Sequence, residues 1–429
     1  MIKIYSRWFL CISILIFYIL SAQARSFSHE DLSGTLTQHS SLPDGIWRAH
    51  LLRKDGQEIS FNFETRDSAE KKILYVMNGK ERLLVDQIRQ VQDSLFIQMP
   101  FFDSRFPLRI SGGNRLDGYW IKNYGDRVVR MPFRAVLNQS ARFTVSQPPR
   151  FDITGRWSAA FNEDNGLMEA VGEFRQSDYR VTGTFLTTTG DYRFLEGVVD
   201  GDSLKISTFD GGDAYYFTAK IDGPGKLSGG LFYAGAVNKE TWKAEKNEKA
   251  ALPDEYSLTR LKNPARATLN FKFKSIDGRM ISILSPAFRN KVVIVQIMGS
   301  WCPNCMDETL FLSDFYQKNR DRGTEIIALA YERTTHFESS KKSLLSFKTR
   351  FHVTYPILVT GVTVMDPLRT EKTLPQLEKI IGFPTTILID RRGQVRKIST
   401  GFNGPGTGDH YEIFKKEFNE QVDSLLNGQ

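Results

Sequence analysis

Two cysteines separated by two residues are the side chains in this sequence most suited to chemistry. Cys302 and Cys305 lie in the segment 299–305, GSWCPNC, directly after the apolar run 291–298, KVVIVQIM. The run is short, rich in β-branched residues and nearly uninterrupted, which predicts a buried strand. Apolar residues on one side and acids in the first turn predict a helix after Cys305. The two thiols therefore belong to a strand-to-helix junction.

This junction predicts a reactive pair of thiols. The N-terminus of a helix presents unpaired backbone N–H groups and the positive end of its dipole. Both stabilise a thiolate and lower the pKa of Cys302. Cys305 lies one turn further along, where it can resolve a mixed disulfide formed at Cys302. The spacing predicts a redox-active disulfide that uses no metal and no other cofactor.

The elements that follow predict the domain that holds the pair. Strands are expected at 325–331, 355–360, 386–390 and 394–400, and helices at 339–351 and 409–426. A βαβ unit followed by a β-hairpin and a helix is an α/β arrangement. We expect this α/β domain over 268–429, after a polar linker at 249–267.

Several short motifs give this region a family resemblance. They are WCPNC at 301–305, GFPT at 382–385, and a lead-in of FKF at 271–273, DGR at 277–279 and Lys291. On these motifs, residues 268–428 resemble the TlpA/ResA-like periplasmic thiol-disulfide oxidoreductases of the thioredoxin superfamily. The resemblance implies a thioredoxin-like fold, a nucleophilic Cys302 and a resolving Cys305.

The resemblance also implies roles for the neighbours of the cysteines. Pro384 would be cis beside the disulfide, which leaves the backbone of Phe383 free to pair with an extended peptide. Trp301 would flank the thiols and exclude water, and Pro303 lies between the cysteines, where it tunes their potential. The implied partners are a disulfide-containing protein substrate and a membrane thiol-disulfide electron donor.

One buried acid of thioredoxins is absent from this sequence. Six residues before Cys302, where thioredoxins keep an acid, stands Gln296, which cannot take a proton. Another group must then accept the proton of Cys305. Glu332, at the end of the second strand, is the predicted acceptor, because catalytic groups gather at strand C-termini in open α/β sheets. A solvated Glu332 that caps a loop is the alternative.

Other functions for the cysteine pair fit the sequence less well. A peroxiredoxin-like peroxidase needs a threonine three residues before its cysteine, and Gly299 stands there for Cys302. A metal carrier would add a third soft ligand or a histidine, for which His336 is the candidate. A structural disulfide that closes so short a loop would stabilise little. The segment 401–408, GFNGPGTG, lacks the Gly-Lys-Ser/Thr of a phosphate loop and could lie at the rim of the active face.

The N-terminal half of the chain repeats itself. GIW at 45–47 recurs as GRW at 155–157, and DSL at 93–95 recurs at 202–204, in each case about 110 residues later. Alternating polar and apolar residues, with Asn-Gly and Asp-Gly turns, predict strands. We expect an all-β tandem repeat of two units, 40–140 and 150–248, each a barrel or a sandwich.

The repeated tryptophans, Trp47 and Trp157, admit two interpretations. A Gly-x-Trp at the start of a β unit resembles lipocalin-type barrels, which would give the units a ligand-binding role. In the simpler interpretation both tryptophans are core anchors. An exported enzyme is therefore weighed against a ligand- or partner-binding envelope protein, in which the thioredoxin-like module serves docking or redox sensing.

The N-terminus and the composition bear on compartment and partners. Lys3 and Arg7 precede an apolar run at 8–20, and AQA at 22–24 follows, which predicts a secretory signal peptide over 1–24. An uncleaved membrane anchor is the alternative. The 429 residues fit two or three domains, and three cysteines exclude a disulfide-stapled scaffold. The net charge of +8 is spread out, which argues against nucleic acid as a partner. We expect a periplasmic or cell-envelope location.

Overall fold

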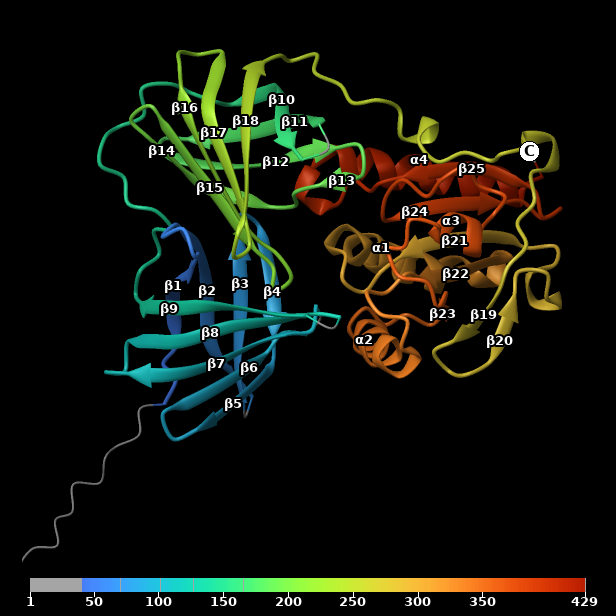
Figure 1. Ribbon diagram of the computed structural model, residues 1–429, viewed down its shortest axis with the longest axis horizontal. Helices are drawn as coiled ribbons and strands as arrows, with labels where there is room; N and C mark the ends of the chain where they lie inside the picture. The colour runs from blue at the N-terminus through green and yellow to red at the C-terminus, as the bar shows by residue number, and fades with distance from the viewer. Residues whose placement is uncertain (1–40, 70, 101, 126, 165, 429) are drawn as a thin grey trace, which may run out of the picture. The chain divides into compact units, whose positions relative to one another are not determined.

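Three β-sheets carry the fold of the part of the chain that the computed structural model describes (Figure 1). The described residues are 41–69, 71–100, 102–125, 127–164 and 166–428. The predicted signal peptide, 1–24, lies outside them. Among the helices of these residues, none has both the length and the apolar character needed to cross a membrane.

The first sheet, blue to cyan in Figure 1, contains nine antiparallel strands. They are β1 (Gly45–Leu52), β2 (Glu58–Ser68), β3 (Lys71–Asn78), β4 (Glu81–Val85), β5 (Gln87–Val91), β6 (Ser94–Gln98), β7 (Ser104–Ser111), β8 (Arg115–Tyr124) and β9 (Arg127–Leu137). Their order is β4-β3-β2-β1-β9-β8-β7-β6-β5, so the first strand pairs with the second and with the last. Along β7, SRFPLRIS, every second residue is buried, as expected for a strand with one face on the core.

The second sheet repeats this plan and closes into a barrel. Its strands are β10 (Gly155–Glu163), β11 (Gly166–Ser177), β12 (Arg180–Thr187), β13 (Gly190–Asp191), β14 (Leu195–Asp200), β15 (Ser203–Phe209), β16 (Ala214–Ile221), β17 (Lys226–Ala234) and β18 (Asn238–Lys246). The order is β11-β10-β18-β17-β16-β15-β14-β12-β13, and an additional pairing of β11 with β12 joins the ends. Again the first strand, β10, pairs with the second and with the last. The prediction of two barrel-like β units is confirmed.

Both tryptophans of the repeat are core anchors. Trp47 in β1 and Trp157 in β10 have no exposed surface. Each indole N–H is satisfied at 2.9 Å, by Thr65 Oγ1 and by the carbonyl of Ile153 respectively. A cavity of about 20 Å³ in the core of the first sheet has room for little more than a water molecule. These observations favour the core interpretation of the Gly-x-Trp motif over a lipocalin-type ligand site.

The third sheet holds the cysteine pair and has an α/β architecture. Its strands are β19 (Lys272–Ser275), β20 (Met280–Ser282), β21 (Val292–Met298), β22 (Thr324–Ala330), β23 (Ile357–Val359), β24 (Thr385–Ile389) and β25 (Val395–Thr400). The helices are α1 (Pro303–Asn319), α2 (Phe337–Arg350), α3 (Arg369–Thr373) and α4 (Asp409–Leu426). The strand order is β20-β19-β23-β22-β21-β24-β25, with β21, β22 and β23 parallel.

The central strand β21 explains why this sheet folds. All seven of its residues are buried, and they alternate between two cores. Ile294 packs in the cluster that contains Leu312 of α1, whereas Val295 packs in the cluster that contains Leu374, at the end of α3. The predicted strand, helix and hairpin order is confirmed, but the short hairpin β19–β20 and α3 were not predicted. The C-terminal end of β21 delivers the chain directly to α1.

Candidate redox-active site

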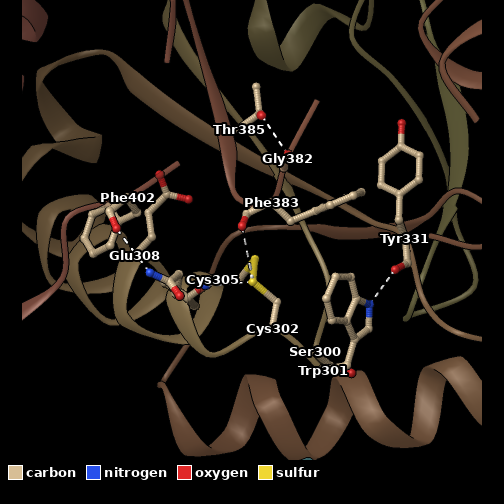
Figure 2. Close-up of a disulfide and its surroundings, with 12 residues drawn as sticks. Ser300, Trp301, Cys302, Cys305, Glu308, Tyr331, Gly382, Phe383, Thr385 and Phe402 are labelled. Carbon is tan, nitrogen blue, oxygen red and sulfur yellow. Dashed lines mark hydrogen bonds between the residues drawn. A yellow bond between two sulfur atoms is a disulfide. The ribbon is translucent and has the colours of Figure 1, made fainter. Parts of the chain in front are cut away.

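Cys302 and Cys305 form a disulfide between the end of β21 and the start of α1 (Figure 2). Their Cα atoms are 5.2 Å apart. Cys302 is the N-cap residue of α1, and its Sγ accepts a hydrogen bond from the backbone N–H of Cys305 at 3.2 Å. Pro303 occupies the first helical position, where its missing N–H leaves no helical hydrogen bond unmade. The helix therefore directs N–H groups at the sulfur of Cys302, which stabilises negative charge there.

The segment before β24 and the Trp301 side chain cover the disulfide. Cys302 is only 4% exposed. Its Sγ lies 3.6 Å from the carbonyl oxygen of Phe383, and the Phe383–Pro384 bond is cis, as the resemblance implied. The rings of Trp301 and Phe383 meet edge to face with centroids 5.5 Å apart. The indole of Trp301 donates a hydrogen bond to the carbonyl of Tyr331 at 2.8 Å, as Figure 2 shows. The structure thus brings the predicted supporting residues together around the sulfur atoms.

Glu332, the predicted proton acceptor, lies two residues beyond the end of β22. It is buried, which excludes a solvated position, and burial raises the pKa of its carboxyl group. One carboxylate oxygen accepts the backbone N–H of Ser300 at 2.8 Å, and the other accepts the hydroxyl of Ser300 at 2.7 Å. Both hydrogen bonds hold the loop that leads into Trp301.

A second buried carboxyl group was missed from the sequence. Glu308 lies three residues after Cys305 on α1 and is 2% exposed. One of its carboxylate oxygens accepts a hydrogen bond from the side-chain amide of Gln296 at 2.8 Å, and the other accepts from Thr386 Oγ1 at 2.6 Å. Residues three apart on a helix share a face. The available signals were this spacing and the lone polar Gln296 in an otherwise apolar buried strand.

The second β unit also contributes residues that the sequence did not predict. Arg193, in the loop after β13, is buried, and its Nε lies 3.2 Å from Asp307 Oδ2 on α1. The same guanidinium forms ion pairs with Asp210, at 3.6 Å, and with Glu81 of β4. Burial raises the pKa of Asp307 to about 8 and that of Asp210 to about 6. We call Arg193, Glu81, Asp210 and Asp307 the ion cluster. Its member Asp307 lies two residues after Cys305 on α1.

The glycine-rich segment 401–408 lies beside the disulfide, at the predicted rim. The side-chain amide of Asn304, between the two cysteines, donates a hydrogen bond to the carbonyl of Phe402 at 3.2 Å. Asp191 Oδ2, from the second β unit, accepts the backbone N–H of Gly404 at 2.8 Å. The segment therefore links the disulfide to the second β unit.

Comparison with known proteins agrees with this site. Residues 266–413 match the family model described as Redoxin. The C-terminal part of the chain is a Redoxin domain. Within the thioredoxin superfamily this Redoxin domain is TlpA/ResA-like, since its curated relatives include thiol-disulfide oxidoreductases named ResA.

Two of these relatives come from the genus Geobacillus. The protein of Geobacillus thermodenitrificans is 28% identical over 31% of this chain and 66% of its own length. That of Geobacillus kaustophilus is 30% identical over 27% of this chain and 57% of its own length. The chain therefore spans somewhat less than two thirds of the length of these two relatives. A putative thiol:disulfide interchange protein DsbE from Chlorobium tepidum is similar over 37% of this chain and 93% of its own, at 18% identity and a TM-score of 0.28.

Proposed function

We propose that this protein is an exported thiol-disulfide oxidoreductase that reduces disulfides of cell-envelope proteins. The observation that carries the proposal is the Cys302–Cys305 disulfide, with the Cys302 sulfur at the N-terminus of α1 and 3.6 Å from the carbonyl of Phe383. A helix N-terminus favours the thiolate, which is the attacking species in thiol-disulfide exchange.

The proposed reaction starts from the reduced pair. The Cys302 thiolate attacks one sulfur of a substrate disulfide, and the other substrate sulfur leaves as a thiolate. The Cys305 thiol loses its proton and attacks Cys302, which releases the second substrate sulfur. Two electrons have then moved to the substrate, and the Cys302–Cys305 disulfide has formed again. A membrane thiol-disulfide carrier is the proposed donor that reduces this disulfide for the next turnover.

Glu308 is the proposed acceptor of the Cys305 proton. It shares a helix face with Cys305, is buried, and keeps its carboxylate oxygens beside Gln296 and Thr386. Glu332 is the proposed positioning residue for the loop before Trp301, because both of its hydrogen bonds go to Ser300. Trp301 excludes water from the sulfur atoms, and the backbone of Phe383 pairs with the incoming peptide.

Export is proposed from the N-terminal pattern alone. Lys3 and Arg7, the apolar run 8–20 and AQA at 22–24 form the signal-peptide pattern. An envelope location would also suit a membrane thiol-disulfide donor. Fractionation of cells that express the full chain tests this: the protein is expected in the periplasmic fraction, shortened by cleavage after Ala24. A full-length protein in the cytosol would contradict export.

The enzymatic proposal is tested with the purified protein and a disulfide-containing protein such as insulin. With a chemical thiol as donor, the wild type is expected to accelerate reduction, and Cys302→Ser is expected to abolish the acceleration. A Cys302→Ser variant as active as the wild type would contradict the assignment of the nucleophile.

A further inference from the structure

One side of the disulfide is filled by the chain itself. The loop 187–194 of the second β unit packs on Gly382, which precedes Phe383, and on Gly401, which precedes Phe402. A β-carbon on Gly382 would lie 2.6 Å from Thr189 Cγ2, and one on Gly401 would lie 2.8 Å from the carbonyl carbon of Thr189. Two non-bonded carbon atoms do not approach this closely, so only glycine fits at these two positions and Thr189 packs directly on both glycines. A substrate cannot approach the sulfur atoms from this side without displacing the loop.

The loop 187–194 is held at two points. Near one end Arg193 pairs with Asp307 of α1, and near the middle Asp191 accepts the backbone N–H of Gly404. Both Arg193 and Asp191 are buried. Breaking a buried ion pair or a buried charge-assisted hydrogen bond is unfavourable. The closed side is therefore a stable part of the site.

The space beside Trp301, by contrast, is not filled by the chain. A cavity of about 490 Å³ lies there, and Ser300 and Trp301, the two residues before Cys302, line it. Its other walls come from α2 and from the first β unit, where Met99 and Phe102 lie between β6 and β7. The volume is within the range of ligand sites, which is roughly 300–1,000 Å³. We call this space the entry cavity.

Unpaired positive charge distinguishes the entry cavity. The Arg333 guanidinium lies over the ring of Trp301, 5.1 Å from its centroid, and over Tyr124, at 4.4 Å. Among the described residues, no carboxylate forms an ion pair with Arg333 or with the exposed Lys342 of α2. By contrast, the ammonium of Lys122 is already used, by the carbonyl of Gly212 and by Asp213.

Two acids, Glu332 and Asp103, line the entry cavity, and its α2 wall is polar. Glu332 is buried against Ser300, and Asp103 accepts a hydrogen bond from Asn123 at 2.9 Å. On α2, four serines and Lys342 line the cavity at helical spacings that place them on one side of the helix; the serines are Ser339, Ser340, Ser343 and Ser346. A ligand here would meet hydroxyl groups and two cations, Arg333 and Lys342, that form no ion pair with any described residue.

We infer that substrate reaches Cys302 through the entry cavity, which selects an extended peptide segment with carboxylate side chains beside its disulfide. This inference rests on the proposed function and adds the class of substrate. The closed loop side excludes a broad docking face, so a narrow extended segment fits. The planar guanidinium of Arg333 can bind a carboxylate in a bidentate manner, one residue away from the indole that flanks the thiols.

The test uses the reduced full-length protein and two fluorogenic peptides of equal length. Each peptide contains one internal disulfide, flanked by aspartates in one peptide and by lysines in the other. The second-order rate constant of reduction is measured for each peptide at low ionic strength. The wild type is expected to favour the acidic peptide by about three- to tenfold, and 0.5 M salt is expected to remove most of the preference.

Charge-reversal variants assign the preference to the entry cavity. Arg333→Glu and Lys342→Glu are each expected to lower the preference, and Arg333→Lys is expected to keep most of it. Lys342 is exposed on α2, so its variant tests the charge without disturbing packing. The matched control is Arg392→Glu in the exposed turn after β24, at the opposite end of the sheet, which is expected to leave the preference unchanged.

Two outcomes separate this inference from the proposed function. Equal rates for the two peptides, or equal effects of Arg333→Glu and Arg392→Glu, would overturn the inference while the reductase activity stands. If the wild type reduces neither peptide and no protein disulfide, the proposed function itself is overturned.

Discussion

Replacing Arg193 by methionine tests whether the ion cluster holds the second β unit on the Redoxin domain. Arg193 is 6% exposed and faces three carboxylates, on Asp307, Asp210 and Glu81. Methionine fills much of the same space without the charge. The variant therefore leaves buried acids without their cation, while the hydrophobic core of each sheet is unchanged.

The expected loss of stability follows from this burial. Removing one partner of a buried ion pair costs about 3–5 kcal/mol, because the remaining charge is left without compensation. The matched control is Arg180→Met on β12, because Arg180 also pairs with a glutamate, Glu196, but is 54% exposed at its side chain. An exposed pair contributes less than about 1 kcal/mol. We expect Arg193→Met to lose several times more stability than Arg180→Met.

The loss should also depend on pH. Burial raises the pKa of Asp307 to about 8 in the folded protein, against about 3.9 for an unfolded aspartate. The folded state then binds the proton more tightly, so the stability from this group is complete below pH 3.9 and is lost as the pH rises towards 8. Without Arg193 the acids resist ionisation further. The loss caused by Arg193→Met should therefore be larger at pH 8 than at pH 5.

Urea unfolding of the oxidised full-length protein, followed by tryptophan fluorescence, measures these differences at both pH values. The double variant Arg193→Met/Asp307→Asn should recover part of the loss at pH 8, because asparagine carries no charge. A loss below about 1 kcal/mol at pH 8, or an equal loss at pH 5 and pH 8, would refute the account of the ion cluster.

Further variants test the roles assigned around the disulfide. Cys305→Ser should accumulate a mixed disulfide between Cys302 and a substrate protein on non-reducing gels, and accumulation by Cys302→Ser instead would reverse the two roles. Glu308→Gln should slow substrate reduction about tenfold or more, as for a lost proton acceptor, whereas Glu332→Gln should slow it much less; the opposite ranking would return the acceptor role to Glu332. Because burial raises the pKa of Glu332, its stability contribution is lost as the pH rises above the unfolded value of about 4.3. Glu332→Gln, measured by thermal unfolding from pH 4 to pH 8, should flatten this loss, and an unchanged slope would exclude Glu332 as its source.

The sequence was sufficient for the parts of the fold that depend on local pattern. Strong β-branched runs predicted β21, β22 and β24, and the spacing of two cysteines before a helix predicted the disulfide site. The repeated Gly-x-Trp motif predicted two β units, and each tryptophan lies near the start of the strand that pairs with both the second and the last strand of its unit. The hairpin β19–β20 was not predicted because its strands have only four and three residues, and β19, KFKS, contains two lysines.

Contacts between distant parts of the chain could not be predicted from the sequence. Arg193 and Asp307 are more than 100 residues apart, and no spacing rule joins them. The role of Glu308 could not be predicted, since its pairing with Gln296 depends on how α1 packs on β21. The entry cavity likewise arises from segments that lie far apart in the sequence, so neither its volume nor its charge could be predicted.

The most direct test of the central claim is a redox titration of the purified full-length protein in dithiothreitol or glutathione buffers. The account predicts one two-electron couple for Cys302 and Cys305, close to the potential of thioredoxin at about −270 mV, and no couple in the variant with both cysteines replaced by serine. A potential near −120 mV would make the protein an oxidant and reverse the proposed electron flow. The absence of any titrating couple in the wild type would contradict the redox function.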